Sequence, residues 1–392
     1  MLKIFFSVNH SGCAWWRSRQ PATMMKKLGL AEVEIFSQYD TERNDIERIL
    51  KWCDMIVAQS PAGVESVALS IQYQRMGKVV IVDYDDLVYS CSPFNPAYRT
   101  LGIRDVNVKD VNGELHTLWK DGEKGFSIKD NYCRYKSQQD LFKIVDAVSV
   151  TTDYLKDRFI EESPGIKDKT IVIPNSIDFN LFKPFEKRKN DRIRIGWITS
   201  SSHLNEIWMV KNIFKKLFEK YGDKIVFVQL GDIGELKSVF TEKEFEYHRF
   251  IDISVYPLKF ASLNLDIGVA PLVDDEFNRC KSSLKWSEYA SMKIPAVCSD
   301  IPPYQCVEDG KTGFLAKTDD EFVEKISRLV DDEVLRREIG QNAYDKNFAD
   351  YNLEKTVVKL YKFYEDTYNR VGECRQETLR QPEILKAQCN CK

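Results

Sequence analysis

The sequence lacks an apolar run long enough to cross a membrane. No window approaches the roughly eighteen consecutive apolar residues of a transmembrane helix. Residues 1–12 contain too short an apolar run for a signal peptide and show no small-residue cleavage site. The 10 cysteines are scattered mostly through expected strands and helices, which is typical of reduced thiols in a cytosol. We therefore expect a cytoplasmic protein; the alternative is peripheral membrane contact through Trp15, Trp16 and residues 24–27.

Histidine is scarce, and the motifs of several enzyme classes are missing. The 4 histidines form no H-E-x-x-H zinc motif, and no G-x-S-x-G nucleophile elbow occurs. Gly12 stands alone after the first expected strand, so the G-x-G-x-x-G dinucleotide fingerprint is absent as well. Cys389 and Cys391 have no further His or Cys nearby to complete a zinc site. These absences argue against zinc and serine hydrolases, and we expect no metal and no cofactor.

The chain also has little net charge, −3 at pH 7. Its overall charge therefore gives no indication that it binds nucleic acid or an anionic membrane. Its basic stretch from Phe182 to Asn190 contains few aromatic side chains. A nucleic-acid patch would interleave aromatic and basic residues, so this stretch is typical of a solvated linker.

An alternation of apolar strands and amphipathic helices is present, and it occurs twice. Strands are expected at 2–8, 33–36, 55–58, 78–83, 147–150 and 170–173, and again at 193–198, 224–230, 265–270, 295–299 and 313–316. A helix is expected over 235–247. The pattern predicts two Rossmann-like, doubly wound α/β domains that face a central cleft. The expected divisions are an N-terminal domain (1–183), a linker (184–191), a C-terminal domain (192–349), a last helix (350–370) and a flexible tail (371–392).

Residues 90–130 interrupt this alternation. They carry several glycines and prolines and show no clear period. A long insertion of this kind is more often a binding loop or a lid than part of a core.

An acidic cluster follows the strand at 78–83. Asp83, Asp85 and Asp86 lie at the expected C-terminal end of that strand, where α/β sheets place their ligands. Two alternatives stay open: a turn that caps the next helix, since Asp is a favoured N-cap residue, and a divalent-metal site.

The stretch Asn278–Asp300 has the composition of an anion site. Lys281, Ser282 and Ser283 offer charge, hydroxyls and free backbone N–H groups at an expected helix start. The first N–H groups of a helix lack partners and its dipole is positive there, which suits a phosphate.

The helix that follows places Lys281, Lys285 and Glu288 on one face. Glu288 would suit ribose hydroxyls beyond the phosphates, as an ionised acceptor. The alternative is a solvated Lys285–Glu288 pair worth a few tenths of a kcal/mol.

A serine-rich loop after Gly196 is a second candidate anion site. Gly196 would allow close backbone approach, and the hydroxyls of Ser200 and its neighbours could meet a phosphate. An ordinary strand-to-helix turn with good caps is the alternative.

Several segments of the sequence resemble motifs of the retaining glycosyltransferases of the GT-B fold, in the family 4 or "group 1" class. The matching segments are Ala270–Leu272, Phe277–Ala290, Pro295–Ser299, Glu308–Leu315 and, before the linker, Ile173–Asp178. In the N-terminal half, the Arg17–Pro21 segment and the acids at 83–86 look like a subgroup of the same class. The resemblance covers residues 165–350 well and the N-terminal half weakly.

Three positions depart from the family pattern. The family's Glu-x7-Glu pair needs an acid at 280, near the transferred sugar, and this chain has Cys280. Ser176 replaces the usual glycine, and the Gly-Gly of the N-terminal loop is reduced to Gly12.

The resemblance implies a last helix that crosses back onto the N-terminal domain. It also implies metal-independent transfer of a sugar from a nucleotide-diphosphate donor, expected to be a UDP-sugar, to an acceptor hydroxyl with retention of configuration. The residues implied in donor binding are Gly196, Ser200, Lys281, Ser282, Ser283, Lys285 and Glu288. The residues implied on the acceptor side are the catalytic candidates His10, Asp85 and Asp86, with Gly12 and Arg17 beside them.

The acceptor stays open between a glycan, a lipid-linked sugar and a modified polymer. One alternative is an enzyme that glycosylates DNA bases or another large polymer, with residues 90–130 touching it; nucleic acid then enters only as the acceptor. Another alternative is a non-catalytic nucleotide-sugar-binding protein, which Cys280 would explain.

Overall fold

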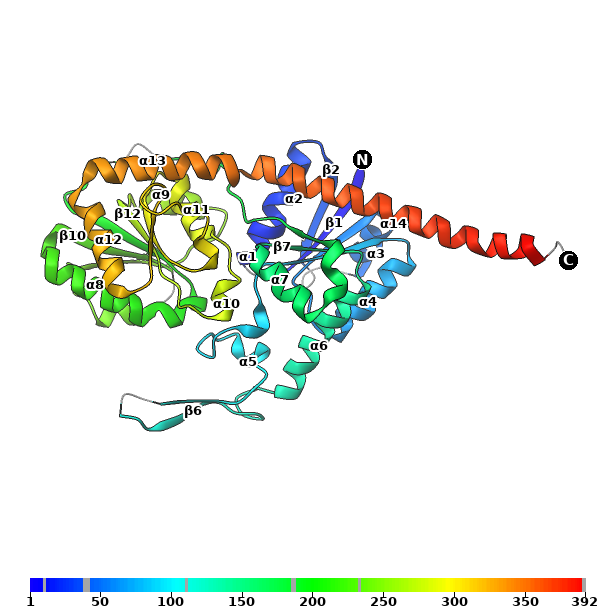
Figure 1. Ribbon diagram of the computed structural model, residues 1–392, viewed down its shortest axis with the longest axis horizontal. Helices are drawn as coiled ribbons and strands as arrows, with labels where there is room; N and C mark the ends of the chain where they lie inside the picture. Colours follow the sequence, from blue (N-terminus) through cyan, green and yellow to red (C-terminus); the bar gives the residue numbers. More distant parts are fainter. Residues whose placement is uncertain (10–11, 38–42, 110–111, 185–187, 232–233, 390–392) are drawn as a thin grey trace.

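The chain folds into two domains, each built on a six-stranded parallel β-sheet (Figure 1). The computed structural model describes residues 1–9, 12–37, 43–109, 112–184, 188–231 and 234–389. Helices pack around each sheet, as expected of the doubly wound arrangement. The predicted α/β fold class is therefore confirmed.

The N-terminal sheet has the strand order β2-β1-β3-β4-β7-β8. Its strands are β1 (Leu2–Val8), β2 (Ala31–Ser37), β3 (Met55–Gln59), β4 (Val79–Tyr84), β7 (Ala147–Val150) and β8 (Thr170–Val172). The helices of this half are α1 (Gly12–Ala14), η1 (Trp15–Arg19), α2 (Gln20–Lys27), α3 (Arg43–Trp52), α4 (Val64–Arg75), η2 (Val88–Ser90), α6 (Ile128–Ile144), α7 (Asp153–Glu162) and η3 (Pro164–Lys169).

The C-terminal sheet has the strand order β11-β10-β9-β12-β13-β14. Its strands are β9 (Ile193–Ile198), β10 (Ile225–Leu230), β11 (Phe245–His248), β12 (Ile267–Ala270), β13 (Ala296–Ser299) and β14 (Phe314–Ala316). The helices of this half are η4 (Ser201–Glu206), α8 (Ile207–Tyr221), η5 (Gly222–Lys224), η6 (Gly234–Ser238), α9 (Tyr256–Ser262), α10 (Glu276–Arg279), α11 (Leu284–Ser291), η7 (Pro302–Tyr304), α12 (Asp319–Asp331) and α13 (Glu333–Asp350).

The strand order reverses at one point in each sheet. In the N-terminal sheet β1 lies between β2 and β3, and in the C-terminal sheet β9 lies between β10 and β12. The loops that leave neighbouring strands at such a point diverge to opposite faces and leave a crevice at the carboxyl edge. The loops after β1 and β9 therefore start at the two places where an open α/β sheet binds ligands.

The helix α14 (Leu353–Cys389) crosses from the C-terminal domain back onto the N-terminal one (Figure 1). Val357, Leu360 and Tyr364 are buried in the same cluster as Ile4 and Phe6 of β1. These positions recur every three to four residues, which gives the helix one apolar stripe for the N-terminal core. The crossover was predicted, but its expected end at residue 370 is wrong, because the helix is continuous to Cys389.

The insertion between β4 and α6 has regular structure that its sequence did not reveal. It contains α5 (Tyr98–Leu101) and an antiparallel hairpin of β5 (Val106–Lys109) and β6 (Leu115–Trp119). The hairpin projects away from both sheets (Figure 1). At its base, Tyr98 and Phe126 pack with Phe277 of α10, so the insertion contacts the C-terminal domain.

Two other expectations need correction. The predicted helix over 235–247 is wrong: only η6 is helical there, and β11 extends the sheet as an edge strand. Of the aromatic and methionine side chains proposed for membrane contact, Trp16, Met24 and Met25 are buried and Trp15 is half-buried. In the part of the chain that the structure describes, no helix is long and apolar enough to cross a bilayer.

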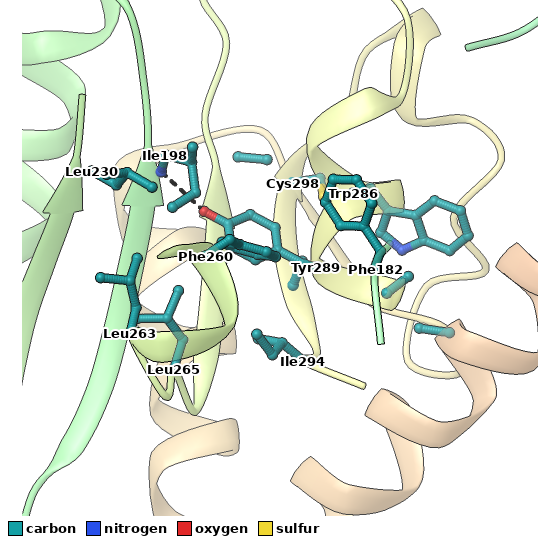
Figure 2. Packing of buried hydrophobic residues seen from close by; sticks show 14 of the residues in the cluster. Phe182, Ile198, Leu230, Phe260, Leu263, Leu265, Trp286, Tyr289, Ile294 and Cys298 are labelled. Atoms are coloured by element: carbon teal, nitrogen blue, oxygen red, sulfur yellow. Dashed lines mark hydrogen bonds between the residues drawn. The ribbon is translucent and has the colours of Figure 1, made fainter. Parts of the chain in front are cut away.

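Tyr289 fixes the position of α11 against the C-terminal sheet (Figure 2). Its hydroxyl accepts a hydrogen bond from the backbone N–H of Ile198 at 3.1 Å and donates one to the carbonyl of Gly196 at 2.9 Å. The ring itself is buried in the apolar cluster beside Phe260. This contact holds α11 against the end of β9, and both elements lead to candidate site residues.

Candidate functional site

A cavity of about 490 Å³ lies between the two domains. The N-terminal domain lines it with Gly12, Cys13, Trp16, Asp85, Asp86 and Asn175. The C-terminal domain lines it with Ile198, Thr199, Ser200, His203, Phe250, Ile253, Tyr256, Leu272, Lys281, Ser282, Leu284, Lys285, Glu288 and Tyr304. Helix α1, the next described element after β1, and the loop after β9 both reach it, as the strand orders require.

The loop between α10 and α11 brings two of the predicted donor residues to this cavity. Lys281 and Ser282 line it directly, at the N-terminal end of α11. Ser283 is the N-cap residue of α11, and its side chain lines a neighbouring cavity of about 890 Å³ that shares Ser282. The helix start therefore faces the cavity with one ammonium group, one hydroxyl and its own positive end.

Lys285 lies one turn further along α11 and meets a buried histidine. Its Nζ lies 2.6 Å from Nε2 of His203, which comes from η4 after the serine-rich loop. Nδ1 of His203 in turn lies 3.4 Å from Oε2 of Glu206. Oε1 of Glu206 accepts hydrogen bonds from Nδ2 of Asn278 at 2.9 Å and from the backbone N–H of Val273 at 3.3 Å.

The protonation of this group follows from burial and from the two lysines. Burial, with the Lys281 and Lys285 charges, lowers the pKa of His203 to about 3, so its imidazole is neutral. Burial and the charge of Lys281 lower the pKa of Lys285 to about 7. Burial opposes ionisation of Glu206, but His203 and both lysines outweigh it and lower that pKa to about 2. In this cluster Glu206 is therefore ionised at neutral pH, whereas Lys285 titrates near neutral pH.

Glu288 also lines the cavity. It is buried, and burial raises its pKa to about 7. Tyr256 is its hydrogen-bond partner, and the charge of Lys285 works against the rise. A carboxylate in such a setting has lost its water, so hydroxyl groups of a bound ligand would replace that hydration.

On the N-terminal side, Asp85 and Asp86 both line the cavity, but they differ in their partners. Asp85 is buried and accepts a hydrogen bond from Nδ2 of Asn175 at 3.0 Å, and burial raises its pKa. Asp86 is half-buried. Burial and the neighbouring Asp85 raise the pKa of Asp86 to about 7, against the opposing charge of Lys281. Asp86 is therefore the carboxyl group better placed to exchange a proton near neutral pH.

Cys13, Asp85 and Asp86 place their ligand atoms within 4.8 Å of one another. A thiol beside two carboxylates mixes a soft ligand with hard ones, whereas magnesium and calcium sites use oxygen ligands. Asn175 and Cys13 are already hydrogen-bonded to Asp85. This donor set fits a hard divalent ion poorly.

Two of the predicted site residues, Arg17 and Gly196, do not line the cavity. Arg17 is buried and pairs with Asp83 through two hydrogen bonds of 2.9 and 2.7 Å, so it supports the acidic loop from within the N-terminal domain. Gly196 lies inside β9, where a Cβ would meet the Leu265 side chain at 2.2 Å. A glycine is therefore required here for packing against Leu265, and not for the approach of a phosphate. His10 lies outside the described residues.

Cys280 occupies an unexpected place. Its side chain is fully buried and belongs to the apolar cluster of the N-terminal domain that includes Tyr84 and Phe142. Its carbonyl accepts a hydrogen bond from Oγ1 of Thr152 at 3.2 Å. The position where the family carries an acid near the sugar is thus an apolar contact between the two domains.

Sequence reasoning missed His203, Glu206 and Tyr256. His203 and Glu206 are three residues apart in η4, a spacing that puts two side chains on one helical face. That spacing could have suggested a pair, but nothing local indicated that Lys285, 82 residues away, would complete it.

The comparisons with known proteins agree with this geometry. Residues 194–332, most of the C-terminal domain, match the family model described as Glycosyl transferases group 1. This match and the two-sheet architecture support a glycosyltransferase of the GT-B fold. A search of curated proteins found no significant match.

Solved structures similar to this glycosyltransferase share its fold at low sequence identity. Sucrose-phosphate synthase from Thermosynechococcus elongatus has a TM-score of 0.65 and 12% identity, over 94% of this chain and 100% of that one. A glycosyltransferase from Rickettsia africae has a TM-score of 0.63 and 11% identity, over 93% and 98%. Anabaena HepE in complex with UDP and glucose has a TM-score of 0.61 and 13% identity, over 93% and 100%.

Proposed function

We propose that this glycosyltransferase moves a sugar from a nucleotide-diphosphate donor to an acceptor hydroxyl, with retention of anomeric configuration and without a metal ion. One observation carries the proposal: Lys281, Lys285 and the buried Glu288 line one cavity together with the start of α11. Two cations and a helix start suit a diphosphate, and a desolvated carboxyl group suits ribose hydroxyls.

The leaving diphosphate is the centre of the proposed mechanism. As the bond from the anomeric carbon to the phosphate oxygen breaks, negative charge grows on that oxygen. Lys281 and the free N–H groups at the start of α11 are fixed beside it, so they stabilise the charge without reorganising. In this role they replace the divalent ion that could otherwise neutralise a diphosphate, and this supports metal independence.

Asp86 is the proposed group that receives the acceptor's proton. It lies on the opposite wall of the cavity from the donor loop, and it titrates near neutral pH. The acceptor oxygen forms the new bond to the anomeric carbon while its proton passes to the Asp86 carboxylate. In a retaining reaction the acceptor attacks from the face that the phosphate leaves. This path fits donor and acceptor groups that share a single cavity.

UDP is the proposed nucleotide. Solved structures of Anabaena HepE contain UDP, UDP with glucose, and UDP-glucose, and that protein shares this fold over 93% of the chain. The identity is only 13–14%, so the likeness guides the choice of the first donor to test.

A panel of nucleotide sugars tests the proposal. The protein is incubated with each donor and a mixture of saccharide acceptors in the presence of EDTA, and the products are followed by NMR. We expect one UDP-sugar to be consumed, UDP to be released, and the new linkage to keep the anomeric configuration of the donor. An inverted linkage would contradict retention, and dependence on added metal would contradict the metal-free mechanism. Tight donor binding with no turnover would favour a non-catalytic protein.

A further inference from the structure

His203 and Glu206 lie next to Lys285, one of the lysines proposed to bind the diphosphate. Lys285 Nζ lies 2.6 Å from His203 Nε2, and His203 Nδ1 lies 3.4 Å from Glu206 Oε2. His203 and Glu206 are buried, with 8% and 1% of their surface exposed. These three groups come from two elements, η4 and α11, that meet at the cavity.

The carboxylate determines which ring nitrogen carries the proton. Glu206 is held in place by Asn278 and by the backbone of Val273. Its negative charge favours a proton on the near nitrogen, Nδ1, and this leaves Nε2 as a hydrogen-bond acceptor. Nε2 can then accept a hydrogen bond from Lys285, whereas the other tautomer would point an N–H at the ammonium group.

We propose that His203, oriented by Glu206, is a positioning residue for Lys285 and makes binding of the donor diphosphate depend on uptake of a proton by that lysine. The proposal rests on the function proposed above and names a regulation of the same site. An acceptor at 2.6 Å favours the charged form of Lys285, while burial and Lys281 oppose it. An arriving diphosphate tips this balance toward the ammonium form.

The charged groups around Lys285 are Lys281 on the preceding loop, Glu288 on its own helix and Glu206 on η4. Burial has the largest effect on the pKa of Lys285 and lowers it, as does the charge of Lys281. The two glutamates raise it, and the resulting pKa is about 7. Lys285 therefore loses its proton as pH rises through about 7, and the affinity for a diphosphate should fall over the same range. UDP-glucose suits the test because its diphosphate keeps a constant charge there.

The chain offers a matched control. His248 has the same kinds of neighbours outside the cavity: its Nδ1 lies 2.9 Å from Lys259 Nζ, and its Nε2 lies 2.6 Å from Glu246 Oε1. A histidine substitution there removes an equivalent trio of groups without touching the donor site.

The experiment measures two quantities on wild type, His203→Leu, His203→Gln and His248→Leu. The first is the affinity for UDP-glucose between pH 5.5 and 8.5 by calorimetry, in two buffers of different ionisation enthalpy. We expect wild type to take up a fraction of a proton near pH 7 and to bind more weakly above it.

His203→Leu should lower the affinity for UDP-glucose about tenfold and move the pH at which affinity falls to a lower value. His203→Gln, whose carbonyl can accept a hydrogen bond from Lys285, should restore the affinity and that pH. His248→Leu should match wild type.

The second quantity needs no ligand. Competitive acetylation of the free protein, read by peptide mass spectrometry, gives the pH at which Lys285 becomes reactive. We expect about 7 in wild type and His203→Gln, and a lower value in His203→Leu. A structural role alone would lower affinity and leave this midpoint unchanged.

Two results would overturn the proposal: a Lys285 midpoint near 10 in wild type, or an identical midpoint in His203→Leu. Binding without proton uptake would overturn the coupling. If UDP-glucose and the diphosphates UDP, GDP and ADP all fail to bind wild type, the proposed function fails, and the acetylation midpoints still decide the role of His203.

Discussion

Asn175 donates a hydrogen bond to Oγ of Ser282 at 3.0 Å, and the same amide nitrogen donates to Oδ1 of Asp85 at 3.0 Å. Its Oδ1 accepts from Nη1 of Arg17 at 3.2 Å. One buried side chain of the N-terminal domain thus bonds the proposed acceptor-side acid Asp85, the proposed donor loop and Arg17. This amide is one of the hydrogen-bonded links between the two walls of the cavity.

Substitution of Asn175 by alanine should loosen this connection. The change removes one of the hydrogen-bond donors to the buried Asp85, which costs about 1–3 kcal/mol of stability. We expect a lower thermal midpoint and a lower turnover, because donor and acceptor groups lose their relative position. Asn180→Ala is the control, since Asn180 is exposed and bonds only surface groups. Equal thermal midpoints for the two variants would contradict the linking role.

A substitution at Asp86 should separate turnover from donor binding. Asp86→Asn keeps the shape of the side chain and removes the proposed base, so kcat should fall by about 10²–10⁴. Donor affinity, measured by calorimetry, should stay within about threefold of wild type. Asp320→Asn, on an exposed surface residue, should change neither. Loss of donor binding in Asp86→Asn would show that the acid acts on the donor side.

The pH profile of the wild-type enzyme follows from the same groups. Asp86 must be ionised to accept a proton, and its pKa is about 7, so the rate rises with pH toward neutrality. Lys285 must be protonated to bind the diphosphate, and its pKa is also about 7, so the rate falls above neutrality. We expect kcat/KM to give a narrow bell near pH 7. A profile that is flat from pH 6 to 8 would contradict both assignments.

Restoring the family's acid at 280 should harm the protein. In Cys280→Glu a carboxyl group enters the apolar contact with Tyr84 and Phe142, where burial without a partner costs several kcal/mol. We expect a large drop in the thermal midpoint. Cys280→Ala, which only shortens the side chain, should cost far less. A Cys280→Glu variant that is as stable as Cys280→Ala, with gained activity, would show that the position faces the sugar.

Local sequence patterns predicted most of the elements, because buried parallel strands are continuous apolar runs and helices repeat their apolar positions. The strands at Leu2–Val8 and Ile193–Ile198 are examples, and so is the stripe Val357, Leu360 and Tyr364 on α14. The hairpin β5–β6 was not predicted, since it lies outside both cores and has no buried face to impose an alternation.

The sequence predicted residues that line the cavity only where a residue of suitable chemistry also lay in a family motif. Lys281, Ser282 and Glu288 reached the cavity, as did Asp85 and Asp86. Arg17, Gly196 and Cys280 share motifs with the site but face cores or the other domain. Which way a side chain points at a domain contact depends on how two sheets meet, and no window of sequence contains that information. His203 needed Lys285 from a distant helix to gain a role.

Donor-dependent stabilisation in wild type and Lys281→Ala is the most direct test of the account. Arg279→Ala is the matched control, because Arg279 is a cation two residues before Lys281, at the end of α10, whose guanidinium pairs with Asp274 and which lines the neighbouring cavity. A donor at about 100 times its Kd should stabilise wild type and Arg279→Ala by about 2.7 kcal/mol, seen as a raised thermal midpoint. Lys281→Ala should lose most of that rise at the same donor concentration. An unchanged rise in Lys281→Ala would contradict the assignment of this cavity as the donor site.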